Sequence, residues 1–185
     1  TPFCPASPYG ASKAAVDLAA AQYRENYGVA AIRVRSFNHI GPVQDDRFVL
    51  PNVAAQIVRA EHEGRESVEV EVGNVDTRRD FTDVRDIVRA YRVLAAEADP
   101  ARAYLPCSGR SLAVRELLEG LAPHARIPVT LISDPSRRRD GEQPDLYGDP
   151  GALRDELGWA PEYSLEATLK DTLADSRRHT TLGPA

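Results

Sequence analysis

Two side chains with complementary acid–base chemistry lie four residues apart near the start of the chain. Tyr9 and Lys13 belong to the segment 7–13 (SPYGASK), which opens a long alanine-rich stretch. Four residues make about one helical turn, so the phenol and the ammonium project from the same face of a helix. A fixed cation beside a phenol favours the phenolate. The pair is therefore a candidate acid–base unit for moving a proton on or off a sugar or alcohol oxygen.

The same spacing also occurs where a tyrosine ring simply packs against the alkyl stem of a lysine. The preceding Ser7-Pro8 favours the chemical interpretation, because proline stops an upstream helix and fits the first turn of a new one. Tyr9 then lies at a helix start, where the positive end of the helix dipole also favours a phenolate.

The composition bounds the class of protein. The chain has 185 residues, with 42% hydrophobic and 28% charged residues and a net charge of -5, which suits one large globular domain or parts of two. A sequence pI of about 5.4 argues against a nucleic-acid surface, and no apolar run approaches the roughly 18 residues of a membrane span. Two cysteines, Cys4 and Cys107, are too few for a disulfide framework or a cysteine metal site. We therefore expect a reducing cytoplasm and no metal.

Two absences suggest that the chain is part of a longer protein. It contains no methionine and begins Thr-Pro-Phe, which indicates a fragment, a processed chain or an incomplete reading frame. It also lacks a glycine-rich phosphate loop, the turn that an open α/β sheet uses to bind a dinucleotide. If the chain works on such a cofactor, we expect the part that holds the pyrophosphate to lie upstream of Thr1.

Helices and strands are predicted to alternate. Helical periodicity predicts helices over 9–27, 48–63, 83–98, 151–157 and 165–178. Apolar or alternating runs predict strands over 29–34, 67–72, 103–106 and 127–132. We expect Ser111 to be the N-cap of a further helix ending near Leu121, and 36–47 and 137–149 to be irregular. The alternation indicates an α/β fold with a parallel sheet.

Several motifs occur in order along almost the whole chain. They are the segments 1–3, 8–13, 35–42 (RSFNHIGP), 56–57, 72–76 (VGNVD), 79–86 (RDFTDVRD), 107–109 (CSG), 148–149 and 158–161 (GWAP). Together they resemble the extended short-chain dehydrogenase/reductase, or NAD-dependent epimerase/dehydratase, family and most of all its GDP-sugar branch. Within that branch, 37–42, 47–49 and 80–86 are more similar to GDP-6-deoxy-D-mannose reductases than to GDP-mannose 4,6-dehydratases.

The resemblance implies a fold, a reaction and partners. The implied fold is a partial Rossmann-like domain, 1–37 and 75–107, interleaved with a smaller α/β sugar-nucleotide domain, 38–74 and 108–185. The implied reaction is reduction of a GDP-4-keto-6-deoxyhexose with NADP or NAD as cofactor. A sugar-nucleotide dehydratase or epimerase is the alternative within the family, and a non-catalytic binding or dimerisation module is the alternative outside it. Relatives pair through the alanine-rich helix, which implies a homodimer.

Four positions match family residues around the reacting carbonyl. The resemblance implies that Tyr9 donates the proton to the C4 oxygen during hydride delivery, and that Lys13 favours the phenolate and binds the nicotinamide ribose. It also implies that Phe37 and His39 face the cofactor. A histidine satisfied by its own surroundings is the alternative for His39.

Three positions match residues that address the nucleotide near that centre. The resemblance implies that Asn38 contacts the substrate diphosphate, with an amide that donates without adding charge. It implies that Phe48 and Val49 line the base pocket. The alternatives are a loop asparagine bonded to its own backbone and ordinary core positions for the two apolar residues.

Three charged positions match the outer part of the nucleotide site. The resemblance implies that Arg79 grips the diphosphate, where a guanidinium fork suits phosphate oxygens. It implies that Arg139 and Glu142 address the nucleoside, with the carboxylate on ribose hydroxyls. Asp140 follows Arg139 here, whereas the family usually has proline, and we interpret Arg78 as a surface charge.

Overall fold

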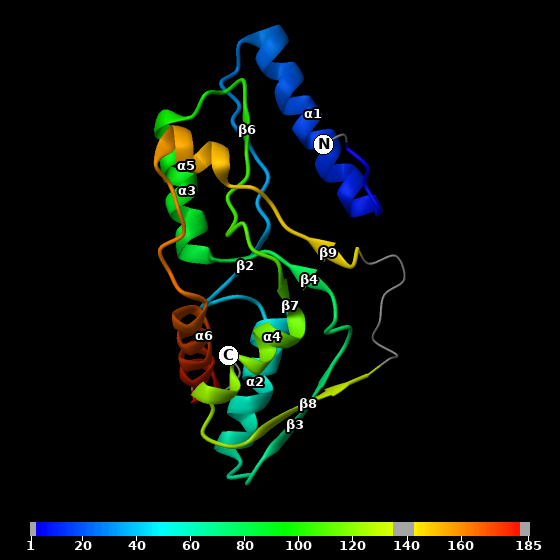
Figure 1. Cartoon of the computed structure of the whole chain (residues 1–185), viewed down its shortest axis with the longest axis vertical. Helices are drawn as coiled ribbons and strands as arrows, with labels where there is room; N and C mark the ends of the chain where they lie inside the picture. The colour runs from blue at the N-terminus through cyan, green and yellow to red at the C-terminus, as the bar shows by residue number, and fades with distance from the viewer. Residues whose placement is uncertain (1–2, 135–142, 182–185) are drawn as a thin grey trace.

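The computed structural model describes residues 3–134 and 143–181 (Figure 1). Its helices are α1 (Pro8–Tyr27), α2 (Val49–His62), α3 (Val84–Glu97), α4 (Val114–Glu119), η1 (Ala122–His124), α5 (Gly151–Leu157) and α6 (Leu165–Thr181). Its strands are β1 (Arg33–Val34), β2 (Asn38–Ile40), β3 (Val68–Val72), β4 (Arg78–Arg79), β5 (Phe81–Asp83), β6 (Ala103–Tyr104), β7 (Leu112–Ala113), β8 (Val129–Ser133) and β9 (Asp145–Leu146).

The strands pair mainly in parallel. The pairs β1–β6, β2–β5 and β3–β8 are parallel, and β4 runs parallel to β9 and antiparallel to β7. Each parallel partner is far away in sequence, with helices in between, as parallel crossover connections require. The predicted α/β fold with parallel strand pairing is confirmed.

Two separate apolar clusters support the molecule. In the lower half of Figure 1, α2, β3, α4 and α6 enclose a cluster that includes Ile57, Val70, Leu117 and Leu173. In the upper half, α3, α5 and β6 enclose a smaller cluster around Trp159, which is 1% exposed. The strands that carry the site residues lie between these clusters, so packing on both sides fixes their course.

The helices α1, α2 and α3 begin and end within one residue of their predicted bounds, whereas α6 runs three residues beyond its predicted end at 178. At the start of α1, the Ser7 hydroxyl accepts a hydrogen bond from the Gly10 N–H at 3.1 Å, and Pro8 occupies the first turn. Gly28 ends α1 with a φ of 68°, a left-handed cap that glycine adopts without strain. Asp83 caps α3 by accepting from the Arg85 N–H. The predicted amphipathic strand at 67–72 is β3, whose residues are alternately buried and exposed.

Some predicted boundaries are wrong, and tertiary contacts explain why. β2 lies inside the segment predicted to be irregular, because pairing with β5 makes a strand of residues whose own pattern is polar. Ser111 does not cap α4, which begins after Ala113. The Ser111 hydroxyl instead donates to the Asp145 carboxylate at 2.6 Å, in the strand β9 that was predicted to be irregular.

Candidate active site

The amino end of α1, the strand β2 and the start of α2 border one cleft of about 810 Å³. Six predicted site residues line it: Tyr9, Phe37, Asn38, His39, Phe48 and Val49. Residues 38 and 39 belong to β2, whereas Tyr9 arrives from α1 and Phe48 and Val49 from the start of α2. The fold therefore brings together residues that are as many as 40 positions apart in sequence, 49 − 9 = 40.

The tyrosine–lysine pair lies in the first turns of α1. The Lys13 ammonium nitrogen is 5.3 Å from the centre of the Tyr9 ring, a distance at which the cation is attracted by the ring face. Tyr9 is 72% exposed. Its phenol is therefore accessible from the cleft and has a positive charge close by, as acid–base chemistry on a sugar oxygen requires.

The β2 wall presents polar side chains on a fixed backbone. Asn38 pairs with Phe81 and His39 with Thr82 across the parallel ladder to β5. Asn38 and His39 are exposed, whereas the next residue, Ile40, is buried in the lower apolar cluster. Burial of Ile40 thus anchors β2, while Asn38 and His39 face solvent and the cleft.

The start of α2 forms an apolar wall of the cleft. Phe48 is 56% exposed and Val49 41% exposed, so neither belongs to the hydrophobic core. The helix is held instead by Leu50, Val53 and Ile57, which are buried. Two exposed apolar side chains at the rim of a cleft suit contact with the face of a planar ring.

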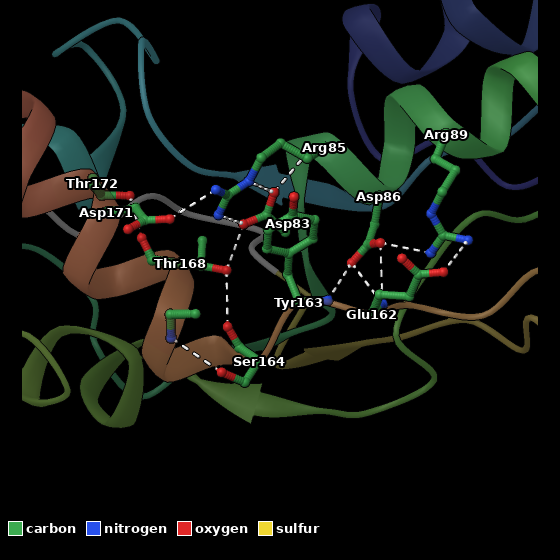
Figure 2. Close-up of polar contacts among 11 residues, drawn as sticks. Asp83, Arg85, Asp86, Arg89, Glu162, Tyr163, Ser164, Thr168, Asp171 and Thr172 are labelled. Carbon is green, nitrogen blue, oxygen red and sulfur yellow. Dashed lines mark hydrogen bonds and ion pairs between the residues drawn. The ribbon is translucent and has the colours of Figure 1, made fainter.

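A buried carboxylate holds the strand opposite β2 (Figure 2). Asp83 accepts hydrogen bonds from the Arg85 guanidinium at 2.7 Å and from the Thr168 hydroxyl at 2.6 Å. Burial alone would raise the pKa of Asp83, but these hydrogen bonds outweigh it and hold the pKa below its ordinary value. The ionised group joins α6 to the end of β5, and so fixes Phe81, which lines the cleft.

Two further carboxylates of the same motif hold loops. Asp80 accepts from the backbone N–H groups of Ser108 and Gly109 at 2.8 and 2.9 Å. Asp86 accepts from the backbone N–H groups of Glu162 and Tyr163, and Figure 2 shows these bonds beside its ion pair with an arginine. All three carboxylates are thus used by the fold. The segment 79–86 contributes to the family resemblance, but the sequence does not predict these buried roles.

Of the three charged residues predicted for the outer site, the structure describes Arg79. Arg79 is on β4 and does not line the cleft; its Nη1 donates to the carbonyl oxygens of Arg78 and Gln143 at 2.7 and 2.8 Å. Arg78, interpreted as a surface charge, is partly buried and donates to the side chain and backbone of Ser111. Arg139 and Glu142 lie outside the described residues.

Several cleft residues were not among the predicted site residues. They are Ser36, Ile40, Gly41, Pro42, Val43, Gln44, Leu50, Phe81 and Val84. Gly41 has a φ of 148°, and a Cβ there would lie 2.9 Å from a methyl carbon of Val84, so only glycine fits. The Gly41-Pro42 dipeptide is typical of an irregular segment such as the one predicted over 36–47. Its place beside the cleft follows only from the fold, in which β2 pairs with β5.

Two general features are absent from the described part of the chain. Residues 3–134 and 143–181 hold no cluster of three or more histidine, cysteine or acidic side chains arranged to bind a metal ion. In the same residues, every helix is too short or too polar to cross a membrane.

Parallel strand pairs, a tyrosine–lysine pair at a helix start and a cleft bordered by the following strands define a Rossmann-like protein of the epimerase/dehydratase class. The family model described as GDP-mannose 4,6 dehydratase matches residues 1–172. The chain belongs to this family.

Individual relatives agree with that assignment. A GDP-6-deoxy-D-mannose reductase from Pseudomonas aeruginosa is 37% identical over 171 residues, 92% of this chain and 56% of the relative. A GDP-mannose 4,6-dehydratase from Vibrio cholerae is 26% identical over 202 residues, 94% of this chain and 54% of the relative. A solved structure of RMD from Pseudomonas aeruginosa complexed with NADPH superposes with a TM-score of 0.85 at 35% identity, covering 94% of this chain and 57% of that one. The chain spans about half the length of the curated relatives it matches.

Proposed function

We propose that the complete protein reduces a GDP-4-keto-6-deoxyhexose with NADPH or NADH, in nucleotide-sugar biosynthesis. The observation that carries this proposal is the convergence of Tyr9, Asn38, His39 and Phe48 on one cleft beside Lys13. The reductase from Pseudomonas aeruginosa is the relative that supports the choice of reaction, at 37% identity.

The residues at the mouth of the cleft fit the nicotinamide end of such a cofactor. A phenol and an ammonium group are suited to the hydroxyl groups of a ribose. When bound, the reduced cofactor supplies a hydride to C4 of the keto sugar. Tyr9 gives its hydroxyl proton to the C4 oxygen, so that the carbonyl becomes an alcohol and the phenol becomes a phenolate. Lys13 stabilises the phenolate until solvent returns the proton.

The remaining residues are proposed to recognise the substrate. Asn38, exposed on β2, donates its amide N–H to the diphosphate, and Phe48 and Val49 contact the base. Arg79, Arg139 and Glu142 bind the diphosphate and the ribose further out. The hydrogen bonds of the Arg79 Nη1 to two carbonyl oxygens orient its guanidinium at the edge of β4.

Two alternative functions each have an observation in their favour. A GDP-mannose 4,6-dehydratase is favoured by the match to that family model and by the relative from Vibrio cholerae. A non-catalytic binding or dimerisation module is favoured by the lack of a glycine-rich phosphate loop in this sequence. The reductase accounts for more, because the higher identity is to a reductase and because Tyr9 and Lys13 adjoin the cleft.

We further propose a cytoplasmic homodimer with two interleaved parts, 1–37 with 75–107 and 38–74 with 108–185. The exposed apolar side chains of α1 support the dimer, since Val16 is 65%, Leu18 58% and Tyr23 55% exposed. Val16 and Tyr23 are seven positions apart and therefore lie on one face of α1, where exposed apolar side chains suit a second copy. The two cysteines are free, as expected in a reducing compartment.

The decisive experiment offers the complete protein two substrates. With a GDP-4-keto-6-deoxyhexose, a reductase oxidises NADPH and forms a GDP-6-deoxyhexose. With GDP-mannose and NADP, a dehydratase forms the keto sugar without net consumption of cofactor. Turnover of the first alone supports the proposal, and turnover of the second alone supports the dehydratase. A folded protein that acts on neither substrate and does not bind GDP in a calorimeter contradicts both enzymes.

A further inference from the structure

The segment 41–44 separates two cavities. Its residues line the cleft that holds Tyr9, and Gly41, Val43 and Gln44 also line a second cavity of about 600 Å³ on the other side. The second cavity is bordered by α2 and α6. The segment 41–44 is thus a thin wall between the two cavities, and its position sets the shape of the cleft. On the side of the second cavity, the packing against this wall is incomplete.

The wall contains a strained residue. Val43 has a φ of 66°, and it is the one non-glycine residue with positive φ among those the structure describes. A β-branched side chain is disfavoured in this conformation because its Cβ crowds the backbone. Val43 is also 81% exposed, so burial of its side chain does not offset the strain. Some other contact has to hold the backbone there.

That contact comes from α6. The backbone N–H of Val43 donates to Oδ2 of Asp175 at 2.8 Å, across 132 positions of sequence. The Asp175 side chain is 11% exposed, and its other oxygen accepts from Arg178 at 2.8 Å. His179 lies 3.5 Å from Oδ2. The carboxylate is thus held in place by its own helix, and a hydrogen bond to a charged acceptor is stronger than one to a neutral acceptor.

The helix that presents Asp175 is itself well supported. Thr168, Asp171 and Asp175 are spaced by three and four residues and therefore lie on one face of α6. Figure 2 shows Thr168 and Asp171 directed towards Asp83 and Arg85, at 2.6 and 2.7 Å. On another face, Leu169 and Leu173 are buried in the lower apolar cluster. Thr168 thus holds β5 and Asp175 holds the 41–44 segment, two walls of the cleft, whereas Asp171 contacts Arg85 on α3.

We propose that Asp175 is a positioning residue of the cleft, which holds Val43 in its left-handed conformation and thereby sets the wall 41–44 for the nucleotide-sugar substrate. The proposal rests on the proposed function for the identity of that substrate. Gln44 extends the effect along the wall, because its side-chain N–H donates to the His39 carbonyl at 3.1 Å. Removal of the Asp175 carboxylate releases Val43 to an ordinary backbone conformation, and the wall 41–44 then shifts relative to β2.

The experiment uses the complete protein and four variants. Asp175→Ala removes the acceptor, whereas Asp175→Asn keeps an oxygen that can accept from Val43. The double variant Asp175→Ala with Val43→Gly removes the strain as well, since glycine adopts the left-handed conformation freely. Asp171→Ala is the matched control, because Asp171 is also an ion-paired aspartate on α6 but contacts Arg85 and not the wall.

We expect Asp175→Ala to raise KM for the keto sugar and Kd for GDP about tenfold while kcat changes less than about threefold. Asp175→Asn and the double variant should recover most of that affinity, and Asp171→Ala should bind as the unaltered protein does. Unchanged KM and Kd in a folded Asp175→Ala protein overturn the proposal. A loss that neither Asp175→Asn nor Val43→Gly corrects also overturns it, because the effect then does not pass through Val43.

Failure of the proposed function is recognised separately. If the unaltered protein neither binds GDP nor reduces the keto sugar, the choice of substrate is wrong. Hydrogen exchange of the Val43 amide then tests Asp175 without any ligand. Exchange faster in Asp175→Ala than in Asp171→Ala supports the positioning role, and equal exchange in the two variants overturns it.

Discussion

The helices α1 and α6 both contribute to the cleft, but α1 is exposed along its length and α6 is partly buried in the core. α1 is 20 residues long, the structure describes all of it, and none of its residues is buried. α6 is 17 residues long, and Thr168, Leu169, Thr172, Leu173 and Asp175 on it are buried. The helix with the reactive pair is thus weakly held by this chain, whereas the helix that supports the walls is part of a core. Chemistry and support are divided between different elements.

A small polar contact holds α1 against the strand that follows it. Asp17 accepts two hydrogen bonds from the Arg35 guanidinium, both at 2.9 Å, and lies 3.7 Å from Arg33. Arg35 also lies over the Phe3 ring, 4.7 Å from its centre. The Arg35 hydrogen bond is the main cause that lowers the pKa of Asp17 from its ordinary value. An ion pair therefore holds α1 in place, whereas apolar packing holds α6 in place.

The largest expected effect tests the chemical side of this comparison. In the complete protein, Tyr9→Phe should reduce kcat about 10²–10⁴-fold, the usual contribution of a positioned general acid. GDP binding, measured by calorimetry, should not change, because Tyr9 is not among the residues proposed to bind the nucleotide. Turnover within a few-fold of the unaltered protein would remove Tyr9 from the mechanism.

A pair of leucines tests the difference in embedding. Leu173 is 0% exposed and Leu18 is 58% exposed. In this chain, Leu173→Ala should lower the free energy of unfolding by about 2–5 kcal/mol. Leu18→Ala should change it by less than about 0.5 kcal/mol. Urea denaturation followed by circular dichroism measures both.

A variant of α1 tests the proposed dimer in the complete protein. Val16→Ala should raise the dissociation constant of the dimer, because Val16 is exposed on the face of α1 that it shares with Tyr23. Analytical ultracentrifugation measures this constant, and an unaltered value would leave that face without a second copy.

Acid should release α1 before it unfolds the lower apolar cluster. The folded state lowers the pKa of Asp17, so the stabilisation is complete above the ordinary carboxyl pKa of about 4 and is lost as pH falls through the lowered value. The contribution is about 1 kcal/mol for a pair that is partly exposed. The protection of α1 amides against hydrogen exchange, relative to the intrinsic rate at each pH, should therefore fall at low pH, and Asp17→Asn should show low protection at every pH. A pH profile that Asp17→Asn leaves unaltered would contradict this role.

Sequence patterns predicted the features that depend on nearby residues. Pro8 in the first turn of α1, the end of α1 before Gly28, the boundaries of α5, those of α3 to within one residue, and the alternation in β3 follow from local propensity and periodicity, and all are confirmed. Six of the residues that motif resemblance singled out, from Tyr9 to Val49, line one cleft. The functional roles of these residues stay predictions.

Contacts between distant segments could not be predicted in this way. β2 is a strand only because β5 pairs with it, and no local pattern in its polar residues signals that pairing. Asp175 and Val43 are 132 positions apart, and an aspartate near the end of an amphipathic helix normally indicates a solvated face. Arg79 could be matched to a motif, but only the β4–β9 pairing shows that it lies away from the cleft.

The two cysteines give the molecule a built-in place for a fluorescent label. Burial, together with the nearby charge of Asp80, raises the pKa of Cys107 to about 12, so its thiol stays protonated and out of reach of reagents. Cys4 is exposed and lies five positions before Tyr9. A maleimide dye therefore attaches to this chain at Cys4 without any prior substitution, five positions before the Tyr9 that lines the cleft.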